Sequence, residues 1–185
     1  SLTFDDEKSS TYKDTKKRGQ YDVPYIPTPF YFLYLIKKVL YQLNIKKFNL
    51  IDIGCGYCRP AKYLAKKFEL SFAGIELSQD IAKKVIDENN KKFNIYNFNL
   101  RDVKKTKSFF KNNLKKNINN VIIISDTVEI NQINKIFKAL DNHYKIILIF
   151  INFKFKKFKN KKFKVKKTIL FKKNSRNIIF LNNYN

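Results

Sequence analysis

The segment IDIGCGYCRP, in the first third of the chain, contains two patterns that could each support chemistry. Cys55 and Cys58 form a C-x-x-C pair, a spacing found in dithiol redox centres and in zinc-binding knuckles. Asp52, Gly54 and Gly56 form D-x-G-x-G, the pattern of a turn that lets backbone approach a nucleotide-type ligand after a strand. These patterns allow three interpretations, a redox centre, a metal site or a ligand-binding turn, and residues elsewhere in the sequence distinguish them.

The dithiol and zinc interpretations find little support elsewhere in the sequence. A thiol between a strand and a helix can be activated by the helix N-terminus, but dithiol exchange needs neither Asp52 nor Glu76. Structural zinc needs four ligands, and the only further soft candidate is His143. We therefore expect a ligand-binding turn and no metal, with a redox centre as the alternative. In the simplest interpretation the cysteines are small residues packed under the turn.

The placement of glycine favours a ligand at this turn. The chain has only four glycines, and Gly54, Gly56 and Gly74 lie in or beside the predicted turn and the next strand. Glu76 follows Gly56 by 20 positions, where an acid can accept both hydroxyls of a ribose or be an exposed turn acid. Asp102, after a third strand, could meet an adenine amino group or only cap the next helix. Together these positions predict a nucleoside pocket at the carboxyl edge of a sheet.

The elements that position these residues alternate between strand-like and helix-like segments. Strands are predicted at 48–54, 71–77, 95–102, 120–125 and 145–152, and helices at 30–43, 59–68, 78–93, 103–117 and 129–140. Two further strands, 162–173 and 177–183, form a hairpin. We therefore predict an α/β, Rossmann-like, mostly parallel seven-stranded sheet with helices on both faces and an antiparallel C-terminal strand pair.

The beginning of the chain differs in character from the rest. Residues 1–20 are polar and charged, and we expect a mobile N-terminal arm followed by a single domain over 21–185. The segment VPYIPTP must be extended, because each proline pushes the preceding residue out of the helical region. It serves either as a rigid strap on the sheet or as part of the site.

The charge is strongly basic, with 39 Lys and Arg against 15 Asp and Glu, a net +24. Such a surface attracts nucleic acid or acidic protein, although Lys, Asn, Ile and Phe are in excess throughout and a compositional bias explains much of the charge. The Phe- and Lys-rich run at 152–167 could grip phosphates, but its alternation favours an edge strand. Apolar runs are too short for a transmembrane segment, no apolar leader opens the sequence, and we expect a cytoplasmic monomer.

Three motifs, LIDIGCG, GIELS and NLRDV, resemble those of class I S-adenosylmethionine-dependent methyltransferases. The arrangement Y-x-P-T-P, then a helix, then D-x-G-x-G is similar to that of small methyltransferases related in layout to the lysine N-methyltransferases of the ATP synthase c-subunit. The resemblance implies S-adenosyl-L-methionine as cofactor, with its methionine part at the glycine turn, its ribose at Glu76 and its adenine at Asp102. It implies direct methyl transfer to a nucleophilic acceptor, with a lean towards a protein lysine amine.

The expected cofactor-binding residues are Tyr25, Thr28, Asp52, Gly54, Gly56, Arg59, Glu76, Asp102 and Ser125. Tyr25 and Thr28 would close over the cofactor, and Arg59 would bind a carboxylate or pair with a nearby acid. Asp126 is the candidate catalytic residue, to orient or deprotonate an amine. The sequence departs from the pattern at the third loop glycine, which is Cys58, and after the fourth strand, where SDTVEI replaces N/D-P-P-Y/F. The alternative is a catalytically degenerate module of this fold that binds RNA or a protein partner.

Overall fold

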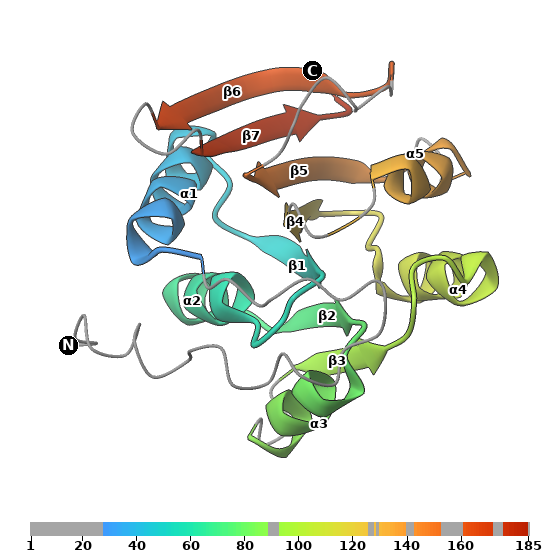
Figure 1. The fold of residues 1–185 in the computed structure, drawn as a ribbon. Helices are drawn as coiled ribbons and strands as arrows, with labels where there is room; N and C mark the ends of the chain where they lie inside the picture. Colours follow the sequence, from blue (N-terminus) through green and yellow to red (C-terminus); the bar gives the residue numbers. More distant parts are fainter. Residues whose placement is uncertain are drawn as a thin grey trace.

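The computed structural model describes residues 28–88, 93–125, 128, 130–139, 143–152, 161–171 and 176–184. Tyr25 and Asp126, two of the expected site residues, lie outside these ranges, as do residues 1–20. A twisted sheet crosses the molecule with helices on either side of it (Figure 1). The chain runs from the helix beside the upper part of the sheet, through the alternating region, to the final strand pair.

The sheet has seven strands in the described part of the chain, in the order β3-β2-β1-β4-β5-β7-β6. The first five in this order are parallel, and β7 pairs antiparallel with both β5 and β6. The predicted mostly parallel sheet with an antiparallel C-terminal pair is confirmed. Its strands are β1 (Phe48–Ile53), β2 (Phe72–Glu76), β3 (Asn94–Asn97), β4 (Asn119–Ser125), β5 (Lys145–Ile151), β6 (Lys164–Phe171) and β7 (Arg176–Asn182).

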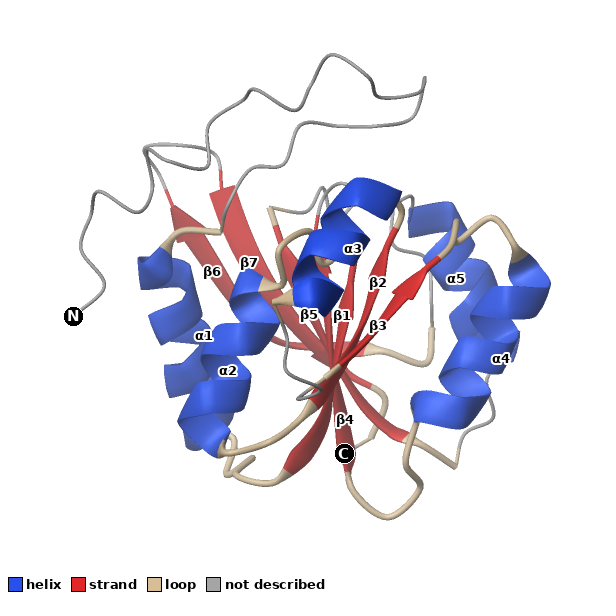
Figure 2. Cartoon of the chain, turned by 90° about the horizontal axis from the view of Figure 1, so that it is seen from below, coloured by secondary structure: helices blue, strands red, loops and turns tan. Residues whose placement is uncertain are grey.

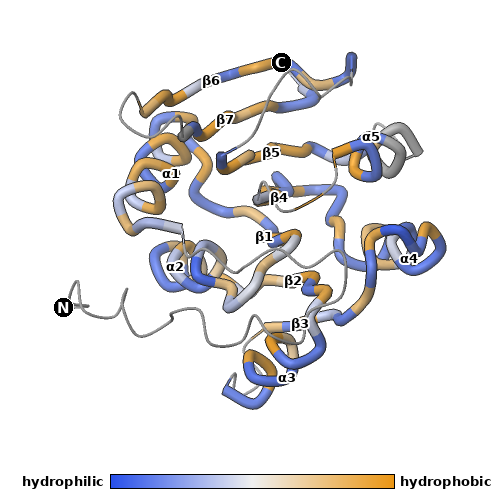
Figure 3. The backbone as a smooth tube through the Cα atoms, viewed as in Figure 1, coloured by the Kyte–Doolittle hydropathy of each residue, from blue (hydrophilic) through white to orange (hydrophobic). Residues whose placement is uncertain are grey.

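Helices cover both faces of the sheet, as predicted (Figure 2). One face carries α1 (Phe30–Gln42), α2 (Arg59–Phe68) and α3 (Gln79–Asp87), whose buried side chains, such as Ile36, Leu64 and Val85, share one core cluster. The other face carries α4 (Val103–Asn113) and α5 (Ile130–Ala139), which contribute Phe110 and Phe137 to a second cluster. The apolar tube segments in the middle of Figure 3 are the central strands, buried on both faces.

Several elements are shorter than their sequence patterns predict. Strand β3 ends at Asn97 rather than at 102, because Asn99 starts a turn: its side-chain oxygen accepts from Arg101 N (2.9 Å) and its carbonyl from Asp102 N (2.9 Å). Helix α4 ends at Asn113 rather than at 117. The Asn113 carbonyl there accepts a hydrogen bond of 2.7 Å from the Asn49 side chain, and Leu114 is extended. In both elements the apolar pattern continues further along the chain, and hydrogen bonds made by side-chain amides end the element earlier.

The outer strand β6 has the features of a protected edge. Lys164, Lys166 and Lys167 are exposed, and the register shifts between Val165 and Lys167, a β-bulge. Phe163 is buried beside this strand. The described part of the run at 152–167 therefore agrees with the edge-strand interpretation, whereas residues 153–160 lie outside the described ranges. Among the described residues no helix is both long and apolar enough to cross a bilayer.

Candidate functional site

The turn after β1 is built on two glycines in left-handed backbone conformations. Gly54 has φ 68° and Gly56 has φ 52°, a region that costs side-chain-bearing residues energy. The Ile75 carbonyl at the end of β2 accepts hydrogen bonds from Gly54 N (2.9 Å) and Cys55 N (3.0 Å). The turn is thereby fixed to the carboxyl end of the neighbouring strand, where a parallel sheet offers its ligand crevice.

Glu76, the last residue of β2, faces this turn. Its Oε2 accepts from Gly56 N at 2.7 Å, and its Oε1 accepts from Ser78 N at 2.8 Å. The structure therefore brings together the acid and the glycine that the sequence places 20 positions apart. Each carboxylate oxygen has a second lone pair, so the half-buried group can still accept hydroxyl donors while the backbone fixes its orientation. A vicinal diol such as a ribose presents two such hydroxyls.

Asp52 lies beneath the turn, near the end of β1, and is 2% exposed. Burial raises the pKa of Asp52 to about 7; a backbone hydrogen bond from Ala61 opposes this effect, and the negative charge of Glu76 adds to it. Its Oδ2 has no hydrogen-bond partner among the described residues. A buried carboxylate oxygen in this state suits a cationic or N–H donor group of a ligand at the turn.

Cys55 and Cys58 are free thiols packed in the core under the turn, 4% and 0% exposed. Their Sγ atoms are 3.1 Å apart, and each Sγ lies 3.7 Å from the Gly56 carbonyl oxygen. Hydrogen bonding to Cys58 and burial raise the pKa of the Cys55 thiol well above its usual value. Cys58, which stands at the third loop glycine, itself has φ 59° and precedes α2 as its N-cap. Its side chain is accommodated in the core cluster beside α2.

Gly74 in β2 is explained by packing. A Cβ at this position would lie 3.0 Å from Cys55 Sγ and 3.0 Å from Ile95 Cδ1. Unlike Gly54 and Gly56, Gly74 has no positive φ, so lack of space is what favours glycine there. Gly74 therefore makes room for the Cys55 thiol below the turn.

Arg59 links the turn to the segment that precedes α1. Its Nη1 donates to the Thr28 carbonyl at 3.4 Å, and its guanidinium lies 4.5 Å from the ring centre of Phe30. Thr28 thus lies beside the first residue of α2, and the end of the proline-rich segment is held near the turn. Whether Thr28 and Arg59 also contact a cofactor stays a prediction.

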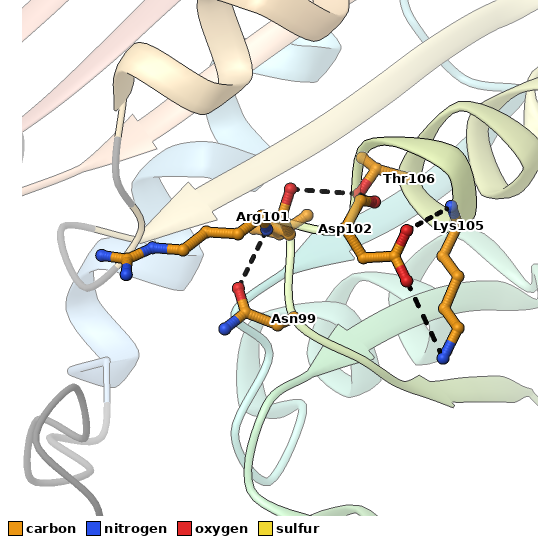
Figure 4. A network of polar contacts seen from close by, with 6 residues as sticks. Asn99, Arg101, Asp102, Lys105 and Thr106 are labelled. Carbon is orange, nitrogen blue, oxygen red and sulfur yellow. Dashed lines mark hydrogen bonds and ion pairs between the residues drawn. The ribbon is translucent and has the colours of Figure 1, made fainter.

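Asp102 caps α4, the simpler of its two predicted roles (Figure 4). Its Oδ1 accepts from Lys105 N at 3.0 Å, its Oδ2 forms an ion pair of 3.9 Å with Lys105 Nζ, and its carbonyl accepts from Thr106 Oγ1 at 2.7 Å. The side chain is 39% exposed, so its outer edge remains accessible. The contact of Asp102 with adenine stays a prediction.

One further polar group borders the turn, and another supports the end of β2. Ser125, at the end of β4, donates from Oγ to the Gly54 carbonyl at 3.5 Å. Asn97 was not among the predicted site residues: its Nδ2 donates to the carbonyls of Glu76 (2.9 Å) and Leu77 (3.0 Å). Asparagine is common in this sequence, so nothing in the sequence marks Asn97 as a site residue. Its position beside Glu76 follows only from the pairing of β2 with β3.

Comparison with known proteins identifies the fold. No protein-family model matches the sequence, and no curated protein matches it significantly. A protein from Escherichia coli that is regarded as a methyltransferase aligns with a TM-score of 0.61 at 7% identity, over 88% of this chain and 92% of its own. An RNA methyltransferase from Salinibacter ruber in complex with S-adenosyl-L-homocysteine aligns with a TM-score of 0.58 at 13% identity, over 85% and 94%.

A mutant of MtNAS in complex with S-adenosylmethionine also aligns, with a TM-score of 0.58 at 13% identity, over 83% of this chain and 62% of that one. The chain therefore has the Rossmann-like fold of class I S-adenosylmethionine-dependent methyltransferases. At these identities the likeness defines the fold, and function has to be argued from the site.

Proposed function

We propose that this protein is a methyltransferase that binds S-adenosyl-L-methionine at the glycine turn. The observation that carries the proposal is the Glu76 carboxylate, held towards the left-handed turn by the N–H groups of Gly56 and Ser78. An acid oriented in this way at the carboxyl edge of a parallel sheet is suited to a ribose. The cofactor expected from the sequence is also the one bound in the MtNAS structure with this fold.

The residues present fit the remaining parts of that cofactor. The buried, unpartnered Oδ2 of Asp52 suits the α-ammonium of its methionine part. The bare backbone at Gly54 and Gly56 allows close approach of that part, and the accessible edge of Asp102 can accept a hydrogen bond from an adenine amino group. Tyr25 and Thr28 are proposed to close over it, and Arg59 and Ser125 to hold the turn.

The cofactor supplies an electrophilic methyl group on a sulfonium, and the protein has to position a nucleophile in line with it. Fixing both partners is worth several orders of magnitude in rate, with no need for a covalent intermediate. Glu76 and the turn hold one partner rigidly, since both carboxylate oxygens are bound to backbone. Asp126, directly after Ser125 in the sequence, is proposed to orient or deprotonate the acceptor.

Two acceptors are proposed for different reasons. The Y-x-P-T-P resemblance leans towards a protein lysine amine, as in the methyltransferases of the ATP synthase c-subunit. The net charge of +24 favours RNA, because a basic surface attracts a polyanion and repels a lysine-rich protein. The Salinibacter ruber enzyme with the same fold is an RNA methyltransferase. The alternative of a catalytically degenerate module is favoured by Cys58 at the third loop glycine.

Titration calorimetry with S-adenosylmethionine and S-adenosylhomocysteine tests the proposal. We expect the wild type to bind both and Glu76→Ala to bind at least about tenfold more weakly, because a hydrogen bond to a charged group is worth roughly 1.5–3 kcal/mol. Asp87→Ala, which removes an exposed acid from the end of α3, is the matched control and should bind like the wild type. Unchanged binding by Glu76→Ala would reject the ribose assignment.

Methyl transfer is measured separately. Radiolabelled methyl groups should pass from the cofactor to either total RNA or a lysine-containing protein fraction, and nuclease or protease digestion identifies which of the two carries the label. Cofactor binding without label in either fraction would favour the degenerate module over the enzyme.

A further inference from the structure

We propose that Cys55 and Cys58 are a site of oxidative modification, where an intramolecular disulfide forms and weakens ligand binding at the glycine turn. The link to ligand binding rests on the function proposed above. Formation of the disulfide does not depend on that function, because it follows from the geometry of the two thiols alone.

The two cysteines are placed for this bond. Their Sγ atoms are 3.1 Å apart, with the Cys58 thiol donating a hydrogen bond to the Cys55 sulfur. The hydrogen bond of 2.7 Å from Cys58 N to the Cys55 carbonyl closes a four-residue turn, which brings the two Cα atoms within about 7 Å. Disulfides span Cα separations of about 4.4–6.8 Å with a bond of about 2.05 Å. A sulfur shift of roughly 1 Å therefore completes the bond.

The oxidant has to be small, because the side chains are only 4% and 0% exposed. Hydrogen peroxide meets this requirement. The Cys55 sulfur, the more exposed of the two, attacks one peroxide oxygen as its thiolate, the O–O bond breaks, and water leaves with a sulfenic acid in place. Because the hydrogen bond to Cys58 and burial raise the pKa of Cys55, this step is faster at alkaline pH. The Cys58 sulfur then displaces the hydroxyl, which leaves as a second water. Two thiols are oxidised to one disulfide, and one peroxide is reduced to two waters.

Gly56 connects the thiols to the ligand site through its carbonyl on one side and its N–H on the other. Both sulfur atoms lie 3.7 Å from the Gly56 carbonyl oxygen, on the side of the residue that faces the core. The N–H of the same residue donates to Glu76 Oε2 at 2.7 Å. Oxidation removes both S–H donors and draws the sulfur atoms together. The turn then shifts at Gly56, and the N–H that orients the carboxylate shifts with it.

Mass spectrometry after peroxide treatment tests the modification itself. The wild type should lose the mass of two hydrogen atoms, and a tryptic fragment should show the Cys55–Cys58 bond that a phosphine reductant reverses. Cys58→Ser, which keeps a hydroxyl donor, should instead gain the mass of one oxygen atom, located at Cys55 in the tryptic fragment. If the wild type remains a dithiol, or becomes oxidised at one sulfur without a disulfide, the proposal is wrong. The wild-type measurement alone decides this if the variant does not fold.

Calorimetry with S-adenosylhomocysteine tests the effect on the turn. The oxidised wild type should bind about tenfold more weakly than the reduced protein, the loss of one oriented hydrogen bond to a charged group. The affinity of the double variant Cys55→Ser/Cys58→Ser, which has no thiol left to oxidise, should not change on peroxide treatment. Equal affinity of the two wild-type forms would reject the coupling. Failure of the reduced protein to bind would reject the proposed cofactor and with it the coupling, while the disulfide would still be judged by its mass.

Discussion

The backbone N–H of Gly56 donates a 2.7 Å hydrogen bond to Oε2 of Glu76, so the turn after β1 and the acid at the end of β2 form one unit. Gly56 makes this contact within a turn in which it has a left-handed conformation, with φ 52°. The conformation of one residue and the orientation of the other are therefore linked, and substitutions at either should affect both stability and ligand binding.

Gly56→Ala should destabilise the protein by about 1–2 kcal/mol, the cost of a left-handed conformation for a residue with a Cβ. Urea denaturation measures the change in the free energy of unfolding. Lys66→Ala, at an exposed position of α2, is the control and should change it by less than about 0.5 kcal/mol. If Gly56→Ala is as stable as the wild type, the turn does not have the backbone described here.

Gly74→Ala should also destabilise, but for a different reason. The new Cβ would meet Cys55 Sγ at 3.0 Å and Ile95 Cδ1 at 3.0 Å, and overpacking of a core costs about 1–3 kcal/mol. Cys55→Ala removes the sulfur, so the double variant should recover part of the loss. A double-mutant cycle measured by urea denaturation gives the coupling energy. Additive effects would show that the two side chains do not compete for this space.

Asp52 should make the protein less stable as pH rises. The pKa of this buried carboxyl is raised from 3.8 to about 7, so between these values the folded state holds a proton that the unfolded state has lost. The free energy of unfolding contributed by Asp52 therefore decreases from pH 3.8 towards about 7 and is level above that. The change over this interval has an upper limit of roughly 4 kcal/mol.

Asp52→Asn isolates this contribution because its side chain has nearly the same shape and does not titrate. Urea denaturation at several pH values should show a smaller fall in stability for Asp52→Asn than for the wild type over this interval. The variant should be the more stable of the two above pH 7. Parallel pH profiles of the two proteins would contradict the raised pKa.

Asp102→Ala should cost about 1 kcal/mol of stability, since it removes the side-chain acceptor of Lys105 N at the start of α4. Asp102→Asn and Asp102→Ser keep a cap and should remain within a few tenths of a kcal/mol of the wild type. Calorimetry on the capped variants then separates the two roles. Weaker binding of S-adenosylhomocysteine by a stable Asp102→Ser would support a contact with adenine, and unchanged binding would leave only the cap.

The order and type of the elements were predictable because their apolar periodicity is strong and their glycines are few. Helix α2 begins at the residue predicted, 59, because Pro60 favours its first turn. It ends at 68, as predicted, where Glu69 takes a left-handed conformation. The predicted ends of β3 and α4 lie several residues beyond the actual ends. The actual ends are set by side-chain amides of Asn99 and Asn49, which reach backbone groups that the sequence pattern does not reveal.

For the site, the sequence by itself determined that Gly54 and Gly56 form a turn and that Glu76 faces it, because the backbone freedom of glycine and the length of a β-α-β unit depend on the local sequence. Only the tertiary structure decided the contacts. Asn97 supports the end of β2 through the pairing of two strands, and Gly74 makes room for a sulfur that lies under a separate turn. Such contacts depend on which strands become neighbours, and that follows from the packing of the whole sheet rather than from the spacing of residues along the chain.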